Sequence, residues 1–168
     1  MANKELIMDF RHIFNLQKQL DETILKYANH DHLIDIARPR LLALLVEVGE
    51  FTNELQTFKY WKKQKQINQQ KMLDELADVL HFAAAISLDL NVEPLIQAKI
   101  IDQDLTEQII GIYNGISLLA QNYSKQNMTT VMQLIYGLCI LLELDTQTIT
   151  NAYKQKNQVN YQRVQSGY

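Results

Sequence analysis

The sequence predicts an all-α helical bundle, and three observations support this fold class. Only five of the 168 residues are glycine and two are proline, so few residues favour turns. Apolar residues recur at three- and four-residue intervals over long stretches, the spacing of one face of an α-helix. The apolar fraction of 47% and the charged fraction of 21% are typical of a folded domain. At this length we expect a single domain over residues 1–168.

The predicted helices follow one another along the chain, separated by polar segments. Asn29–His32 and the polar stretch 62–70 are expected to be connections. The apolar segment from Leu95 to Tyr123 is expected to form one long or interrupted helix, in which Gly111 and Gly115 permit close helix packing. The other expected helices cover about residues 4–28, Pro39 to Phe58, 69–90, 129–143 and 146–157.

Charge and cysteine content exclude several classes of partner. A net charge of -3 gives no bulk attraction to nucleic acid or anionic lipid, so we expect neither a direct nucleic-acid partner nor a membrane partner. The apolar run Leu41–Val46 is far shorter than the roughly 20 residues of a membrane span. Met1–Leu6 lacks the features of a secretion signal, and the single cysteine, Cys139, cannot form an internal disulfide. A cytoplasmic location is expected.

Two pairs of acidic residues suggest the chemistry of the protein. Glu47 and Glu50 are three residues apart, so on a helix their side chains share one face. Glu75 and Asp78 repeat this spacing on the next predicted helix. Both pairs lie in strongly apolar sequence, where an uncompensated carboxylate is costly to bury. A cation is therefore expected between the two helices.

Magnesium fits this set of ligands, because hard divalent cations bind carboxylate oxygens and can be shared with the phosphates of a substrate. We expect two or three ions, with manganese as a substitute. No cysteine and histidine pattern typical of structural zinc lies nearby. Asp74 and Glu54 extend the acidic surface and either contact a metal or face solvent. The alternative is that all these acids are solvated or pair with basic side chains, but the repeated spacing on consecutive apolar helices favours the metal site.

The two acidic pairs match E-x-x-E followed by E-x-x-D, the signature of the all-α nucleoside triphosphate pyrophosphohydrolases, a MazG-like superfamily. Within it, the chain most resembles the dimeric dUTP diphosphatases. The C-terminal segment is similar to that family's K-N-x-x-N-x-x-R motif, which is followed by G-Y. The segments that carry the closer resemblance are Leu16–Asp21, Phe58–Lys62, Asp78–Phe82, Tyr153–Arg163 and Gly167–Tyr168.

The resemblance implies a homodimer with a four-helix catalytic core and a C-terminal segment, about residues 154–168, that closes over the substrate. It implies magnesium-dependent hydrolysis of dUTP to dUMP and pyrophosphate, which limits uracil incorporation into DNA, with dUDP as a candidate second substrate. The implied catalytic and metal-binding residues are Glu47, Glu50, Glu75 and Asp78. The implied substrate-binding residues are Gln17, Lys59, Trp61, Lys62, His81, Phe82, Lys156, Asn157, Asn160, Arg163 and Tyr168.

Other interpretations remain open for several of these residues. Gln17 alone could be a core amide, Trp61 a partly buried surface anchor, and His81 a residue that orients Asp78 or packs in the core. A pyrophosphohydrolase of the same superfamily that acts on dCTP or a modified nucleotide is the nearest rival function. A helical regulatory or protein-binding module without catalysis is the rival from another class. The apolar helices after Leu95 offer a surface for dimerisation.

Overall fold

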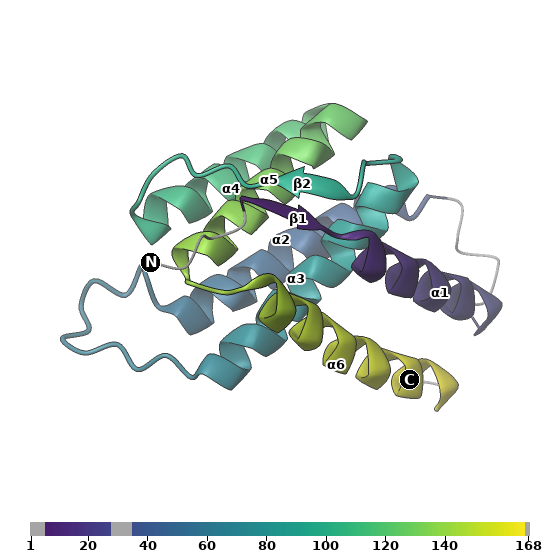
Figure 1. The fold of residues 1–168 in the computed structure, drawn as a ribbon, viewed down its shortest axis with the longest axis horizontal. Helices are drawn as coiled ribbons and strands as arrows, with labels where there is room; N and C mark the ends of the chain where they lie inside the picture. Colours follow the sequence, from purple (N-terminus) through teal and green to yellow (C-terminus); the bar gives the residue numbers. More distant parts are fainter. Residues whose placement is uncertain (1–5, 28–34, 167–168) are drawn as a thin grey trace.

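A computed structural model describes residues 6–27 and 35–166, which form an all-α protein with one pair of very short strands (Figure 1). The predicted fold class is confirmed. In chain order the elements of the described residues are β1 (Ile7–Asp9), α1 (Arg11–Tyr27), α2 (Ala37–Leu55), α3 (Gln69–Asp89), β2 (Leu95–Gln97), α4 (Leu105–Gln121), α5 (Lys125–Leu141) and α6 (Thr146–Gln165).

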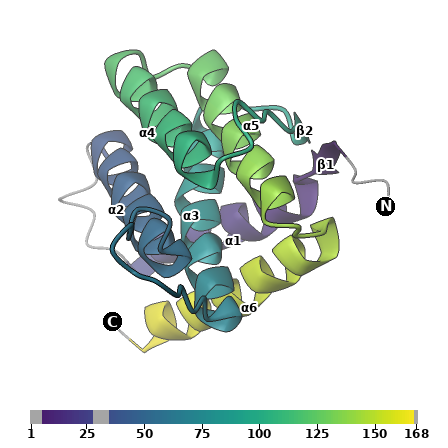
Figure 2. The same cartoon turned by 90° about the vertical axis from the view of Figure 1, so that its left-hand side faces the viewer.

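Helix α3 lies at the centre of the molecule, and the other helices pack around it (Figure 2). It contacts α2, α6, α1 and α5, and the run Ala83–Ser87 is completely enclosed. Helices α4 and α5 form a pair on one side, and α1 and α6 form a pair on another. Helices α1, α2, α3 and α6 form the four-helix core that the sequence predicted.

Polar side chains define where several helices begin. The Asp104 carboxylate accepts a hydrogen bond of 2.7 Å from the backbone N–H of Thr106, and the Asp145 carboxylate accepts one of 2.6 Å from that of Thr148. Asn68 caps α3 in the same way. These bonds satisfy backbone donors that the first turn of a helix leaves unpaired. The helix start at Asp145 agrees with the sequence prediction, which placed it at residue 146.

The two strands contradict part of the sequence prediction. Residues 4–28 were expected to be one helix, but Ile7–Asp9 form a strand antiparallel to Leu95–Gln97, with Met8 opposite Ile96. The segment from Leu95 is likewise not helical at its start, because α4 begins only at Leu105. The buried Met8 and Ile96 alternate with exposed neighbours. Three residues of such alternation are too few to distinguish from helical spacing.

Other boundaries also differ. Helix α2 ends at Leu55, not near Phe58, because Gln56 adopts a left-handed conformation with φ of 56°. Helix α5 begins at Lys125, four residues earlier than predicted, at the Ser124 cap. Helix α6 continues to Gln165, whereas the prediction ended it at residue 157. Its polar second half is helical because it packs along α1 and α3. The predicted connection Asn29–His32 lies outside the described residues.

Helix α5 is the most enclosed part of the α4–α5 pair. Its sequence from Leu134 to Ile140 is entirely buried and includes the free Cys139. Burial raises the pKa of the Cys139 thiol to about 12, so this group is a small apolar core residue. Within the described ranges, no single helix is long and apolar enough to cross a membrane, and α5 with α6 meets that criterion only as a pair bent by 113°.

Glycines allow close contacts around α4 and α5, and Gly115 packs against α5 as expected, whereas Gly111 meets Ile101 in the β2–α4 connection and not another helix. A Cβ atom on Gly115 would lie 3.2 Å from Leu134 Cδ1, and one on Gly111 would overlap the Ile101 side chain. The tightest backbone contact is at Gly137, where a Cβ atom would overlap the carbonyl oxygen of Lys99. The β2–α4 connection therefore lies directly on α5.

Replacing Gly137 with alanine should destabilise the protein by about 1–3 kcal/mol, because the backbone carbonyl of Lys99 must move to admit the methyl group. Urea unfolding followed by circular dichroism measures the change. Gly115→Ala is the matched control, since its new methyl group meets side-chain methyl groups of Leu134 and Val131, at 3.2 and 3.4 Å, and no backbone atom. A Gly137→Ala variant as stable as the wild type would contradict this view of the contact.

Candidate active site

The predicted acidic residues meet in a cleft of about 470 Å³ that is open to solvent. Residues from α1, α2, α3 and α6 form its walls, so all four core helices contribute to it. We call this cavity the acidic cleft, and its lining residues are Ile24, Glu47, Glu50, Glu75, Asp78, His81, Phe82, Lys156, Asn160, Arg163 and Val164.

The packing of α2 against α3 explains why the acids converge. Val48 on α2 and Leu76 and Val79 on α3 are buried in the core. Glu47, Glu75 and Asp78 each directly precede one of these buried residues. Because neighbouring residues on a helix point about 100° apart, the carboxylates lie at the edge of the interface between the two helices. The apolar contact thus sets the distance between the acids.

Three of the four predicted acids form a compact ligand set. Glu47, Glu75 and Asp78 each offer a carboxylate oxygen, and these atoms all lie within 4.8 Å of one another. Glu50 lines the same cleft but does not belong to this group of three. All the donors are hard oxygens, which magnesium and manganese prefer. The residues present therefore fit the expected divalent cation.

The carboxylates also interact electrostatically. Partial burial, with smaller effects from Asp78, Glu50 and Glu75, raises the pKa of Glu47 to about 7. Burial is the main cause of the raised pKa values of Glu75 and Asp78 as well. Bringing several carboxylates together out of water disfavours their charged forms. A bound cation would reverse this effect, since it favours the ionised carboxylate.

Lys156 on α6 already supplies positive charge to this cluster. Its Nζ lies 2.5 Å from Asp78 Oδ2 and 3.0 Å from Asp74 Oδ2. Asp74, for which the sequence left metal binding and solvent exposure open, thus pairs with a lysine and lies outside the compact ligand set. The salt bridges connect α6 to the acidic face of α3.

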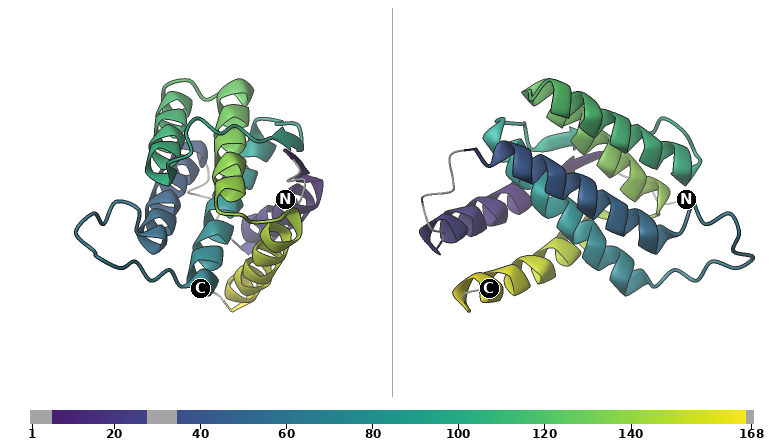
Figure 3. Two further views of the ribbon diagram at one scale, coloured as in Figure 1. Left: turned by 60° about the vertical axis from the view of Figure 1, so that its left-hand side comes forward. Right: turned by 180° about the vertical axis from the view of Figure 1, so that it is seen from behind.

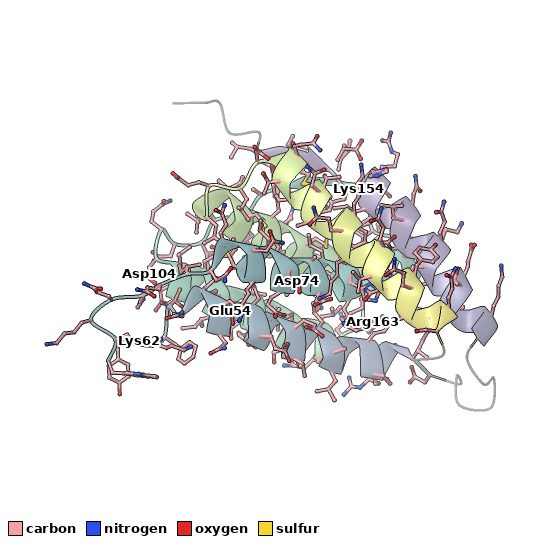
Figure 4. The ribbon with its side chains drawn as sticks, turned by 90° about the horizontal axis from the view of Figure 1, so that it is seen from below. Glu54, Lys62, Asp74, Asp104, Lys154 and Arg163 are labelled. Atoms are coloured by element: carbon pink, nitrogen blue, oxygen red, sulfur yellow. The ribbon has the colours of Figure 1, made fainter. Side chains whose placement is uncertain are left out.

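The second half of α6 completes one wall of the acidic cleft. Asn160 and Arg163 lie four and seven residues after Lys156, so the three share one face of the helix. Figure 4 shows Arg163 near the C-terminal end of α6. Asn157, in contrast, is buried and is not among the lining residues. Ile24 and Val164 also line the cleft, and no motif in the sequence pointed to them.

His81 and Phe82 line the acidic cleft, and their role as walls of a base and sugar pocket stays a prediction. Their rings meet edge to face with centroids 4.9 Å apart. Burial lowers the pKa of His81 to about 4, with a smaller effect from Arg40 and Lys156. The imidazole is therefore neutral near pH 7 and offers one donor and one acceptor. The neutral His81 ring is therefore a polar part of the cleft lining, beside the apolar ring of Phe82.

A second cavity of about 310 Å³ adjoins the acidic cleft and shares Ile24, His81 and Phe82 with it. We call it the apolar pocket, because most of its surface is hydrocarbon. Its lining residues are Asp21, Ile24, Leu25, Ile36, Pro39, Arg40, Ala43, His81, Phe82 and Ala85. Asp21 and Arg40 were not predicted as site residues. The four-residue spacing of Gln17 and Asp21 places them on one face of a helix. The pairing of Asp21 with Arg40 joins two helices, so no local pattern in the sequence indicates it.

Gln17 occupies a different position from the one its expected role suggests. It is buried and lines neither cavity. Its Oε1 accepts a hydrogen bond of 2.6 Å from the Tyr153 hydroxyl, and its Nε2 donates one of 2.7 Å to Asp21 Oδ1. This arrangement corresponds to the alternative of a core amide. Contact between Gln17 and a nucleobase stays an untested prediction.

The segment between α2 and α3 carries the remaining predicted residues away from the cleft. Lys59, Trp61 and Lys62 are absent from its described lining, and Trp61 is 61% exposed. Lys59 Nζ and Lys62 Nζ instead donate hydrogen bonds to groups at the end of α2. The segment projects from the end of the molecule opposite the C-terminal end of α6 (Figure 3), and Figure 4 shows Lys62 far from Arg163. Tyr168 lies outside the described residues.

A comparison of the sequence with models of known protein families identifies the family of this chain. A family model described as dUTPase matches residues 9–168, a range that includes every residue lining the two cavities. The chain belongs to the dUTPase family. It is accordingly an enzyme that hydrolyses dUTP, and the resemblance found in the sequence is confirmed. The rival view of a non-catalytic binding module is wrong. No curated protein shows significant similarity to the chain.

In the absence of metal, stability should fall as the pH rises from the ordinary glutamate pKa of 4.5 to about 7, the pKa of Glu47 in the folded state. Within this window the folded protein holds a proton that the unfolded chain has released, so raising the pH favours unfolding. Thermal unfolding with a chelator at pH 5.5 and pH 7.5 measures the difference. Glu47→Gln has no carboxyl group there and should show a weaker dependence. An unchanged dependence in that variant would contradict the assignment.

Proposed function

We propose that the acidic cleft holds magnesium against the phosphates of dUTP and that dUMP and pyrophosphate are the products. The convergence of Glu47, Glu75 and Asp78 from two helices is the observation that supports this most strongly. The cleft adds cationic side chains from a third helix, as phosphate binding requires. Two or three ions are proposed, with manganese as a substitute for magnesium.

Different residues of the acidic cleft have different roles in the proposed reaction. Bound magnesium neutralises phosphate charge and lowers the pKa of water. Glu47, Glu75 and Asp78 hold the cation, and Glu50, which lines the cleft outside that group, positions or deprotonates the attacking water. Lys156 and Arg163 donate to phosphate oxygens, and Arg163 can do so through two N–H groups at once. The apolar ring of Phe82 disfavours a ribose 2′-hydroxyl that would find no partner there.

The remaining predicted residues act when the site closes. We propose that the C-terminal segment, about residues 154–168, closes over the substrate, with Asn160 already in the lining of the acidic cleft and Asn157 and Tyr168 joining it. Lys59, Trp61 and Lys62 would join from the segment between α2 and α3, where Trp61 is exposed and the two lysines donate hydrogen bonds to groups at the end of α2. Ordering of such segments would exclude water from the reacting phosphates.

A homodimer is proposed as the working form. Ile110 and Leu118 on α4 are 46% and 55% exposed, and Leu42 and Val46 on the neighbouring α2 are exposed as well. An apolar surface shared by two packed helices is suited to a second copy of the chain. Light scattering measures the mass in solution, and a monomer at micromolar concentration would contradict the proposal. The cytoplasmic location stays a prediction.

Among nucleotides, dUTP should be hydrolysed most efficiently, and omission of magnesium should abolish turnover. The panel contains dUTP, dUDP, dCTP, dTTP, UTP and dATP, with pyrophosphate and phosphate release measured separately. Release of pyrophosphate from dUTP supports the proposed products. A preference for dCTP or for a purine nucleotide would contradict the substrate assignment and favour the rival pyrophosphohydrolase.

Substitution of the metal-binding acids should reduce dUTP hydrolysis roughly a hundredfold or more, since each supplies part of the electrostatic stabilisation. Glu47→Gln and Asp78→Asn preserve side-chain size and remove charge. Glu107→Gln removes the same charge from the first turn of α4, away from the cavities that the metal-site acids line, and it should retain activity. Magnesium binding measured by calorimetry should weaken in the first two variants only. Wild-type turnover in Glu47→Gln or Asp78→Asn would refute the metal site.

A further inference from the structure

Asp74 on α3 is an acidic residue to which neither the family match nor the expected site residues assign a function. It precedes Asp78 by about one helical turn, but it does not line the acidic cleft and lies outside the group of three metal-binding acids. It lines instead a separate cavity of about 170 Å³ between α3 and α6. Its Oδ2 atom accepts a hydrogen bond of 3.0 Å from Lys156 Nζ. This bond connects Asp74 to the acidic cleft.

The ammonium group of Lys156 shares a carboxylate with the expected metal ion. Lys156 Nζ lies 2.5 Å from Asp78 Oδ2, and the two side chains are 11% and 19% exposed. Asp78 also supplies one of the three carboxylate oxygens that lie within 4.8 Å of one another. Two cations at one carboxylate repel each other strongly where little water separates them. Lys156 and a divalent cation therefore compete for Asp78.

Lys156 needs another partner when it leaves Asp78. Because its side chain is largely enclosed, water cannot fully replace the lost ion pair. Asp74 is already bonded to the same Nζ atom, and it stays available when a cation occupies the metal-binding group, to which it does not belong. The two aspartates are four residues apart on one face of α3. Lys156 can thus keep one bond while it gives up the other.

We infer that Asp74 is a positioning residue, which retains Lys156 at the edge of the acidic cleft after a divalent cation has taken its place at Asp78. The inference rests on the proposed function, because it requires that a cation binds Asp78. Lys156 then keeps two of its three N–H groups for phosphate oxygens. Without Asp74, cation binding leaves the ammonium group enclosed and unpaired, which lowers the affinity for the cation.

Magnesium binding in the absence of nucleotide, measured by calorimetry, tests this role. Asp74→Asn should weaken binding about tenfold, the size of one charge-assisted hydrogen bond. The same substitution also removes a negative charge near the metal site, which weakens binding through space. Lys156→Met separates the two effects, because it removes the competing ammonium group and keeps the apolar part of the side chain.

In the Lys156→Met background, Asp74→Asn should change the magnesium affinity by about twofold or less, since no ammonium group has to move. Equal weakening in both backgrounds would show that Asp74 acts through its charge alone, which overturns the inference. Lys156→Met by itself should bind magnesium more tightly than the wild type. Lys154→Met is the matched control, because it removes the same charge from the same helix and Lys154 does not line the acidic cleft. Its affinity should stay within about twofold of the wild type.

The wild type provides an independent measurement if Asp74→Asn does not fold. Nuclear magnetic resonance of lysine side chains detects the Nζ signal of Lys156, which is assigned by its loss in Lys156→Met. Magnesium should shift this signal, because the ammonium group exchanges a bond to both aspartates for a bond to Asp74 alone. A signal that saturating magnesium leaves unchanged would overturn the inference.

The outcomes separate the two claims. A wild type that binds no magnesium refutes the metal site of the proposed function. Magnesium binding that Asp74→Asn weakens equally with and without Lys156 refutes only the role of Asp74.

Discussion

The apolar contact between α2 and α3 is the constraint on which the site depends. Burial of Val48 against the core, with Leu76 and Val79 on the facing helix, positions the backbone of both helices. This packing also determines the positions of the acids, because Glu47, Glu75 and Asp78 are each adjacent in sequence to one of the buried residues. The favourable burial of hydrocarbon therefore offsets the unfavourable approach of like charges.

Helix α6 connects this acidic face to the rest of the molecule. Tyr153, in its first half, is buried against α1 and anchors Gln17. Lys156, one turn further on, pairs with Asp78 and Asp74 on α3. The same helix thus stabilises the fold with one turn and supplies the charge of the cleft with the next. A change in the charge of Asp78 would consequently alter the salt bridge that holds Lys156, and with it α6, against α3.

The sequence predicted the helical class and the acidic pairs, because both depend on regular spacing within one helix. Lys156 and Arg163 were found only through the resemblance of the C-terminal segment, since the predicted helix ended at residue 157 and α6 continues to Gln165. Glu47 with Glu50 and Glu75 with Asp78 are local patterns. The ion pair of Asp21 and Arg40 was missed because it joins two helices, and nothing near either residue indicates its partner. Gln17 illustrates the same limit, since its position on α1 was predictable but the Tyr153 hydroxyl that occupies its amide oxygen is 136 residues away.

The balance of charge in the acidic cleft explains why metal and nucleotide should enter together. When all four acids are ionised, they outnumber Lys156 and Arg163, and His81 is neutral near pH 7. The cleft alone would then repel a triphosphate, despite the two cations on α6. Two or three divalent ions would reverse the sign of the site and allow the phosphates to reach Lys156 and Arg163.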